Sequence, residues 1–155
     1  RMDIAIFDQA FSFSDNQDFF NSISIVEFKK PNRNDLKDDN KNPINQVLGY
    51  VKNIKEGRAK RPNGRPFVNV SNTAFYCYVI ADLTDSMREA AENASLMMTP
   101  DREGYFGYNQ TRGAYIEVIS YDKLVKDAKQ RNQILFDKLF NPKVTEVLNS
   151  KLLNE

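Results

Sequence analysis

The chain has 155 residues, a net charge of +1 and 41% hydrophobic residues. This length and composition predict a single folded domain over residues 1–155 and exclude a disordered chain. Because the charge is nearly balanced, a nucleic-acid partner would have to meet a local basic patch. There is no histidine and only one cysteine, Cys77, which excludes Ser-His-Asp and Cys-His catalysis and His-based zinc sites.

The same composition gives expectations about location. No apolar run reaches the length of a membrane-spanning helix, so we expect no membrane partner. A lone cysteine within an aromatic run is typical of a buried thiol in a reducing, cytoplasmic compartment. The chain enters a strand pattern at Asp3 without a leading segment, and we therefore expect a C-terminal fragment of a longer protein.

Two strands are predicted first. Residues 3–7 form a short apolar run, and a polar loop with turn residues follows it. Residues 23–29 (ISIVEFK) form the second strand, which Pro31 ends.

A helix is predicted to begin at Pro43, with Asn42 as its N-cap. Apolar residues recur at helical spacing up to Ile54, and Gly57 ends the pattern. The segment 52–65 carries six Lys or Arg and one Glu, which makes it the most basic part of the chain.

Strand and helix patterns alternate over the rest of the chain. They predict a strand buried on both faces over 75–83, a helix from Thr84 or Asp85 to about Met97, a strand or bend over 104–109, a strand over 115–120, and a long helix from Ser120 to about Phe140. The sum predicts an α/β fold.

The second strand carries two charges where a core strand would carry none. Charged side chains are rarely buried unless they are paired, solvated at an edge or bound to a metal. Because side chains alternate along a strand, Glu27 and Lys29 project from the same face. Val26 and Phe28 are then predicted to face the core. If the first strand pairs with the second, Asp3 lies beside Glu27.

Two neighbouring carboxylates repel each other unless a cation lies between them. Mg²⁺ or Mn²⁺ suits this place, because these ions take carboxylate, carbonyl and water oxygens. The predicted ligands are Asp3, Glu27 and the backbone carbonyl of Phe28. Lys29 would face the same cavity and could steer or polarise a water on the metal, an arrangement suited to phosphodiester hydrolysis.

The helix that follows places Gln46 and Tyr50 on one face, four residues apart. Asp3, then Glu27-Phe-Lys29 at the end of an apolar strand, then Gln46-x-x-x-Tyr50, resembles the PD-(D/E)xK nuclease superfamily and its RecB-like branch. The resemblance implies a restriction-endonuclease-like mixed sheet flanked by helices, Mg²⁺ dependence and DNA cleavage. It implies these roles: metal ligands Asp3 and Glu27, catalytic lysine Lys29, supporting residues Gln46 and Tyr50.

Two later segments carry a looser resemblance. FYCYVIADLT at 75–84 and AYIEVISYDKLVKDAKQRNQILFDKL at 114–139 are similar to C-terminal domains of bacterial GHKL-type ATP-binding proteins. This resemblance implies that the rest of a parent protein, including a GHKL-type ATPase domain, is a partner of the chain.

Several alternatives stay open from the residues alone. The basic residues after the helix (Lys52, Lys55, Arg58, Lys60 and Arg61) are predicted to contact the DNA backbone, or they form a solvated loop. Glu27 and Lys29 could form a surface ion pair at a strand end. The chain could also be an inactive module of the same fold that binds nucleic acid or a partner domain. A third alternative is a small-molecule phosphohydrolase or an accessory domain of an ATPase.

Overall fold

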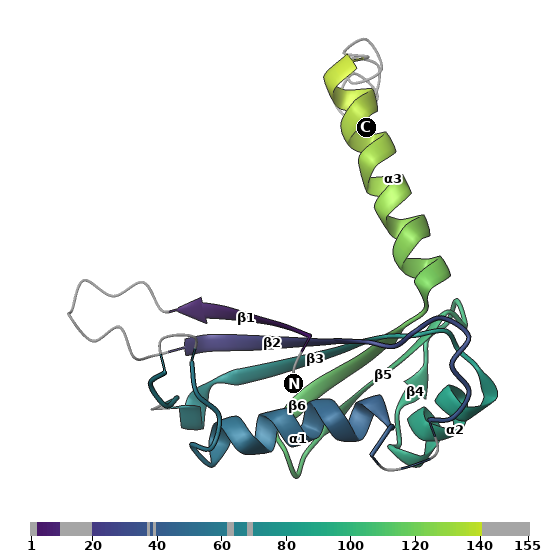
Figure 1. The fold of residues 1–155 in the computed structure, drawn as a ribbon. Coiled ribbons are helices and arrows are strands. Elements are labelled where there is room, and N and C mark those ends of the chain that lie inside the picture. The colour runs from purple at the N-terminus through teal and green to yellow at the C-terminus, as the bar shows by residue number, and fades with distance from the viewer. Residues whose placement is uncertain are drawn as a thin grey trace, which may run out of the picture. The chain divides into compact units, whose positions relative to one another are not determined.

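The structure contains a six-stranded mixed sheet with strand order β1-β2-β3-β6-β5-β4 (Figure 1). The computed structural model describes residues 3–9, 20–36, 38, 40–61, 64–67 and 70–140. The strands are β1 (Ile4–Gln9), β2 (Phe20–Phe28), β3 (Ala74–Ile80), β4 (Met97–Met98), β5 (Gly104–Asn109) and β6 (Ala114–Ile119). β2, β3 and β6 are parallel to one another, and the other pairings are antiparallel. The predicted α/β class, a mixed sheet flanked by helices, is confirmed.

The chain divides into two compact units, Arg1–Tyr121 and Asp122–Glu155. The first unit holds the whole sheet, α1 (Pro43–Lys55), the short 3-10 helix η1 (Val70–Asn72) and α2 (Asp85–Asn93). Helix α3 (Tyr121–Phe140) begins at the last residue of the first unit and makes up the described part of the second.

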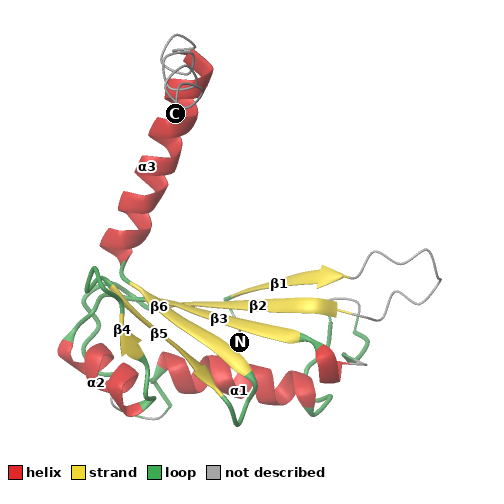
Figure 2. Ribbon diagram, turned by 180° about the vertical axis from the view of Figure 1, so that it is seen from behind, coloured by secondary structure: helices red, strands yellow, loops and turns green. Residues whose placement is uncertain are grey.

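Helix α1 begins where the sequence predicts it. The side chain of Asn42 accepts hydrogen bonds from the backbone N–H groups of Ile44 and Asn45, at 2.9 and 3.3 Å, and Pro43 occupies the first turn. Both features stabilise a helix start. The helix lies against one face of the sheet (Figure 2). The side chains that it buries there are Ile44, Val47, Val51 and Ile54.

The opposite face of the sheet is more open within the first unit. On β3, Phe75, Cys77 and Val79 are buried, whereas Tyr76 is 39% exposed and Tyr78 is half-buried. The prediction that this strand is buried on both faces is therefore wrong, because α1 covers only one face. Burial raises the pKa of the Cys77 thiol to about 12, so this cysteine is a neutral core group at physiological pH.

Helix α2 is shorter than predicted. It ends at Asn93, and Ser95 has a left-handed backbone with φ of 57°. A non-glycine residue in that conformation interrupts a helix. Met97–Met98 then pairs with β5 as the edge strand β4, so the helix predicted to reach Met97 is wrong over its last turn.

Helix α3 carries exposed apolar side chains along its C-terminal half. Ile134, Leu135, Phe136, Leu139 and Phe140 are each more than half exposed. The rings of Phe136 and Phe140 stack with centroids 5.6 Å apart. In the part of the chain that the structure describes, no helix is long and apolar enough to cross a membrane.

Two glycines test this packing in opposite directions. A Cβ at Gly104, the first residue of β5, would lie 2.4 Å from the backbone oxygen of Val118. Gly104→Ala must therefore shift a strand, and we expect it to lower the free energy of unfolding by about 1–3 kcal/mol.

A Cβ at Gly49, inside α1, meets nothing within 4 Å. We expect Gly49→Ala to raise stability by about 0.5–1 kcal/mol in urea unfolding. Equal effects of the two substitutions would contradict the strand packing described here.

Candidate functional site

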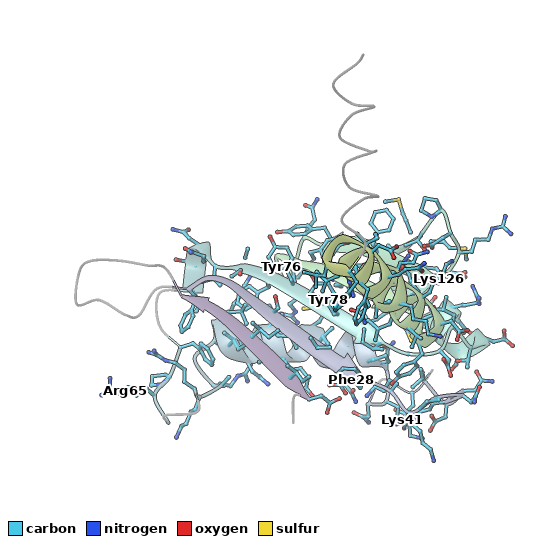
Figure 3. All side chains as sticks on the ribbon, turned by 90° about the horizontal axis from the view of Figure 1, so that it is seen from above. Phe28, Lys41, Arg65, Tyr76, Tyr78 and Lys126 are labelled. Atoms are coloured by element: carbon cyan, nitrogen blue, oxygen red, sulfur yellow. The ribbon has the colours of Figure 1, made fainter. Side chains whose placement is uncertain are left out.

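The candidate site lies where β2 ends, on the sheet face that α1 covers. Glu27 is 5% exposed and Lys29 is 7% exposed. Phe28, between them, is 40% exposed, and Val26 is half-buried; Figure 3 shows the position of Phe28 at the end of the strand. The prediction that Val26 and Phe28 face the core is therefore wrong. The face that α1 buries is the one that carries Glu27.

A buried ion pair forms the centre of the site. The Lys29 Nζ atom lies 2.7 Å from Oε1 of Glu27 and donates a second hydrogen bond to Oε1 of Gln46, at 2.5 Å. The Nε2 atom of Gln46 donates to the backbone oxygen of Asn40 at 2.7 Å. Because that carbonyl can only accept, it turns the amide oxygen of Gln46 towards the ammonium. The ammonium is thus held by β2 and by the first turn of α1 together.

Tyr50 lies one helical turn after Gln46, and the same carboxylates influence its hydroxyl. Burial raises the pKa of Tyr50, and the charges of Glu27 and Asp3 and a hydrogen bond with Glu27 raise it further. The hydroxyl therefore stays protonated at neutral pH and can donate a hydrogen bond. The structure brings Gln46 and Tyr50 to the same cluster, as their spacing on the helix predicts.

Asp3 is the residue before β1. Ile4, the first residue of β1, is paired with Val26, and the same antiparallel register continued by one residue sets Asp3 opposite Glu27. The exposed carboxylate of Asp3 accepts a hydrogen bond from the backbone N–H of Phe28 at 2.8 Å, through Oδ2. The expectation that these two carboxylates are neighbours agrees with this register.

One oxygen of Glu27 is left over. Oε2 of Glu27 is buried, and among the described residues it has no hydrogen-bond partner. A buried charged oxygen without a partner is costly, and a hard cation would satisfy it. The described residues contain no group of three or more Cys, Asp or Glu side chains arranged around one point. A metal at this place would have the two carboxylates of Asp3 and Glu27, the Phe28 carbonyl and waters, which suits Mg²⁺ because it keeps several waters.

Two residues that the sequence analysis did not single out support the end of β2. The Tyr121 hydroxyl donates to the backbone oxygen of Lys29 at 2.7 Å, and Oδ2 of Asp82 accepts from the N–H of Asn32 at 2.7 Å. Burial, then the charges of Asp82 and Asp3, raise the pKa of Tyr121. Each follows a strand parallel to β2, and the carboxyl ends of parallel strands meet at one edge, so both residues can be found once the strand order is known.

The basic residues after Gln46 lie along the rest of α1 and beyond it. Nine residues separate Gln46 from Lys55, which is about 13 Å along a helix axis. Lys55 Nζ donates to the backbone oxygen of Arg112, Arg58 pairs with Glu56, and Arg61 donates to the Pro66 oxygen at 3.1 Å. The structure therefore does not bring these basic residues into the Glu27 cluster.

Comparisons of the chain with protein-family models, with curated proteins and with solved structures give no match. The chemistry of the site therefore has to be argued from its own residues.

The ion pair predicts a large and specific effect on stability. Lys29→Met leaves the Glu27 carboxylate buried without its cation, and we expect the free energy of unfolding to fall by about 3–5 kcal/mol. The double variant Lys29→Met/Glu27→Gln removes both charges and should recover a large part of that loss. Urea unfolding of the single and double variants measures the coupling.

Lys123, which pairs with Asp127 at 3.7 Å on α3, provides the control. Lys123→Met should change stability by less than about 1 kcal/mol, as is usual for surface pairs. Equal losses for Lys29→Met and for the double variant would show that the buried charges are not coupled.

Proposed function

We propose that the chain hydrolyses phosphodiester bonds of DNA with Mg²⁺ or Mn²⁺ at the cluster of Asp3, Glu27 and Lys29. The observation that carries the proposal is the buried Oε2 of Glu27, which has no partner among the described residues. The first carboxylate oxygen of Glu27 already binds Lys29, and Asp3 precedes Ile4, which is paired with Val26 next to Glu27. An ion pair that served packing alone would need neither the free oxygen nor the second carboxylate.

Each residue has a role in this proposal. Asp3, Glu27 and the backbone carbonyl of Phe28 would hold the ion. Bound Mg²⁺ would supply charge neutralisation on the phosphoryl oxygens and a more acidic water. Lys29, fixed in place by Gln46, would orient the attacking water or the scissile phosphate. Tyr50, whose hydroxyl is hydrogen-bonded with Glu27, would help to seat the carboxylate and the lysine that face the scissile phosphate.

Basic residues at a distance from the cluster would suit a chain that acts on a long polyanion. Lys52 lies in the last turns of α1, and Lys55 follows it there. We include Lys52, Lys55, Arg58, Lys60 and Arg61 as contacts to the DNA backbone at a distance from the hydrolytic centre. The rest of a parent protein, with a GHKL-type ATPase domain, stays a proposed partner on the strength of the resemblance alone.

A second function is favoured by one observation. Oδ2 of Asp3 already accepts a hydrogen bond from Phe28 N–H, and Lys29 has two acceptors within the chain. The cluster can therefore hold the end of β2 without any ion. An inactive module of this fold, which binds nucleic acid or a partner domain, would need nothing more.

Metal titration separates the two functions. We expect isothermal titration of Mn²⁺ into the wild-type chain to show one site, and Glu27→Gln and Asp3→Asn to weaken binding at least about tenfold, since each removes a charged ligand. Glu92→Gln, an exposed carboxylate on α2, serves as the matched control and should bind as the wild type does.

Thermal unfolding of each variant shows whether the variant is still folded, so that a loss of Mn²⁺ binding can be assigned to the site. Absence of Mn²⁺ binding in the wild-type chain would rule out the hydrolytic proposal and favour the inactive module. Binding that persists unchanged in Glu27→Gln would place the metal elsewhere.

Tyr50→Phe tests the contribution of this tyrosine while leaving both charges of the ion pair in place. The substitution removes only the hydroxyl, and partners of this kind are worth about 10–100-fold in activity. We expect the cleavage rate of labelled DNA in Mg²⁺ to fall within that range, while Mn²⁺ binding changes little. Tyr78→Phe, which removes the hydroxyl of a half-buried tyrosine on β3 outside the cluster, is the control, and an equal loss of cleavage in both variants would contradict the role given to Tyr50.

A further inference from the structure

A pocket of about 300 Å³ opens at the edge of the sheet where β3 and β6 begin, whereas Glu27 lies near the end of β2. Its lining includes Lys55, Ser71, Asn72, Tyr76, Tyr108 and Tyr115. Lys55 and Ser71 also line a larger hollow of about 550 Å³ beside it. None of the residues of the Glu27 cluster lines either hollow, so the pocket is a separate feature of the molecule.

The three tyrosines of the pocket lie side by side on neighbouring strands. Tyr115 of β6 is paired with Tyr76 of β3 on one side and with Tyr108 of β5 on the other. The rings of Tyr76 and Tyr115 meet edge to face, with centroids 6.2 Å apart and an interplanar angle of 62°. Tyr108 is 62% exposed and Tyr76 is 39% exposed, and Figure 3 labels Tyr76 on β3. The row is therefore an aromatic surface that solvent reaches.

The polar groups of the pocket are of two kinds. Some are used within the fold: Thr73 donates through Oγ1 to the Phe20 oxygen at 2.9 Å, and Tyr115 donates to Oε2 of Glu117 at 3.4 Å. In the described part of the chain, the side chains of Ser71 and Asn72 and the hydroxyls of Tyr76 and Tyr108 have no hydrogen-bond partner. Within the described part of the chain, nothing competes with a ligand for these groups.

The described residues that line the pocket carry one kind of charge. They include the ammonium of Lys55 and no carboxylate. Gly113, whose φ is +61°, lets the hairpin between β5 and β6 approach this ammonium, because a Cβ there would lie 2.9 Å from Lys55 Nζ and 3.6 Å from the Tyr108 hydroxyl. The absence of a side chain at Gly113 thus leaves room for the Lys55 ammonium next to the three tyrosines.

We propose that this tyrosine pocket binds a nucleotide of a single-stranded nucleic acid. Aromatic rings stack on the face of any base, and an adjacent cation binds its phosphate. The amide of Asn72 and the hydroxyl of Ser71 can bind the edge of a base that is not paired. In a duplex the base faces are covered by their neighbours and cannot reach the tyrosines, which is why the geometry favours a single strand.

The inference does not rest on the hydrolytic function proposed above. Binding is measured in EDTA, where no metal-dependent cleavage occurs, and it is measured again with Glu27→Gln. Failure of the hydrolytic proposal would leave the binding result intact, and the reverse also holds.

The test uses fluorescence anisotropy of a labelled oligothymidylate of about 12 nucleotides, within the usual site sizes for single-strand binding. We expect Tyr108→Ala and Tyr76→Ala to weaken affinity about tenfold or more, since loss of one stacking ring has effects of that size. Tyr108→Phe keeps the ring and should retain most of the affinity. Met97→Ala, a 61% exposed residue outside the pocket, is the matched control and should bind like the wild type.

Three results would overturn the inference. The wild-type chain could fail to bind the single strand. It could bind a duplex of the same length as tightly, with no effect of the tyrosine substitutions, which would mean contact with the phosphate backbone alone. Thymidine monophosphate could displace the strand at an equal concentration of nucleotide, which would assign the pocket to a free nucleotide.

Discussion

The pairing of Lys29 with Glu27 and Gln46 is the constraint on which the arrangement of this unit depends. Moving an ammonium or a carboxylate out of water costs several kcal/mol for each ion, and only good geometry repays it. Both charges here are nearly fully buried, so they must meet. Because Gln46 belongs to the first turn of α1, the pairing fixes the start of that helix against the end of β2. An apolar pair would pack without this directional requirement.

Because α1 is fixed against one face of the sheet, the two faces differ in burial and in the side chains that they carry. One face receives α1 and buries Ile23, Ile25 and the charged pair. The other keeps its aromatic side chains partly in solvent, with Tyr76 and Tyr108 beside Tyr115. Tyrosine suits such a position, since its ring packs against its neighbours while its hydroxyl stays wet. The two proposed sites, the Glu27 cluster and the tyrosine pocket, therefore belong to the same sheet but are separate from each other.

Local rules predicted the elements well and their surroundings less well. Helix α1 follows from the cap at Asn42 and the apolar spacing, and the position of Asp3 opposite Glu27 follows from strand pairing. Alternation tells which residues share a face, but not which face a helix will cover, and so Val26 and Phe28 were assigned to the wrong one. The support of Lys29 by Tyr121, 92 residues later, depends on the order of strands in the sheet, which no local pattern contains.

The electrostatics of the cluster give the proposed ion a further role. The carboxylates of Asp3 and Glu27 outweigh the single ammonium of Lys29 by one negative charge, so without an ion the cluster repels a phosphate. A divalent cation reverses the sign, and the same residues then attract one. The ammonium cannot replace the ion, because it is held by Oε1 of Glu27 and by Gln46, and Oε2 has no partner in the part of the chain that the structure describes. Attraction of the substrate and completion of the buried hydrogen-bonding network would thus depend on the same bound cation.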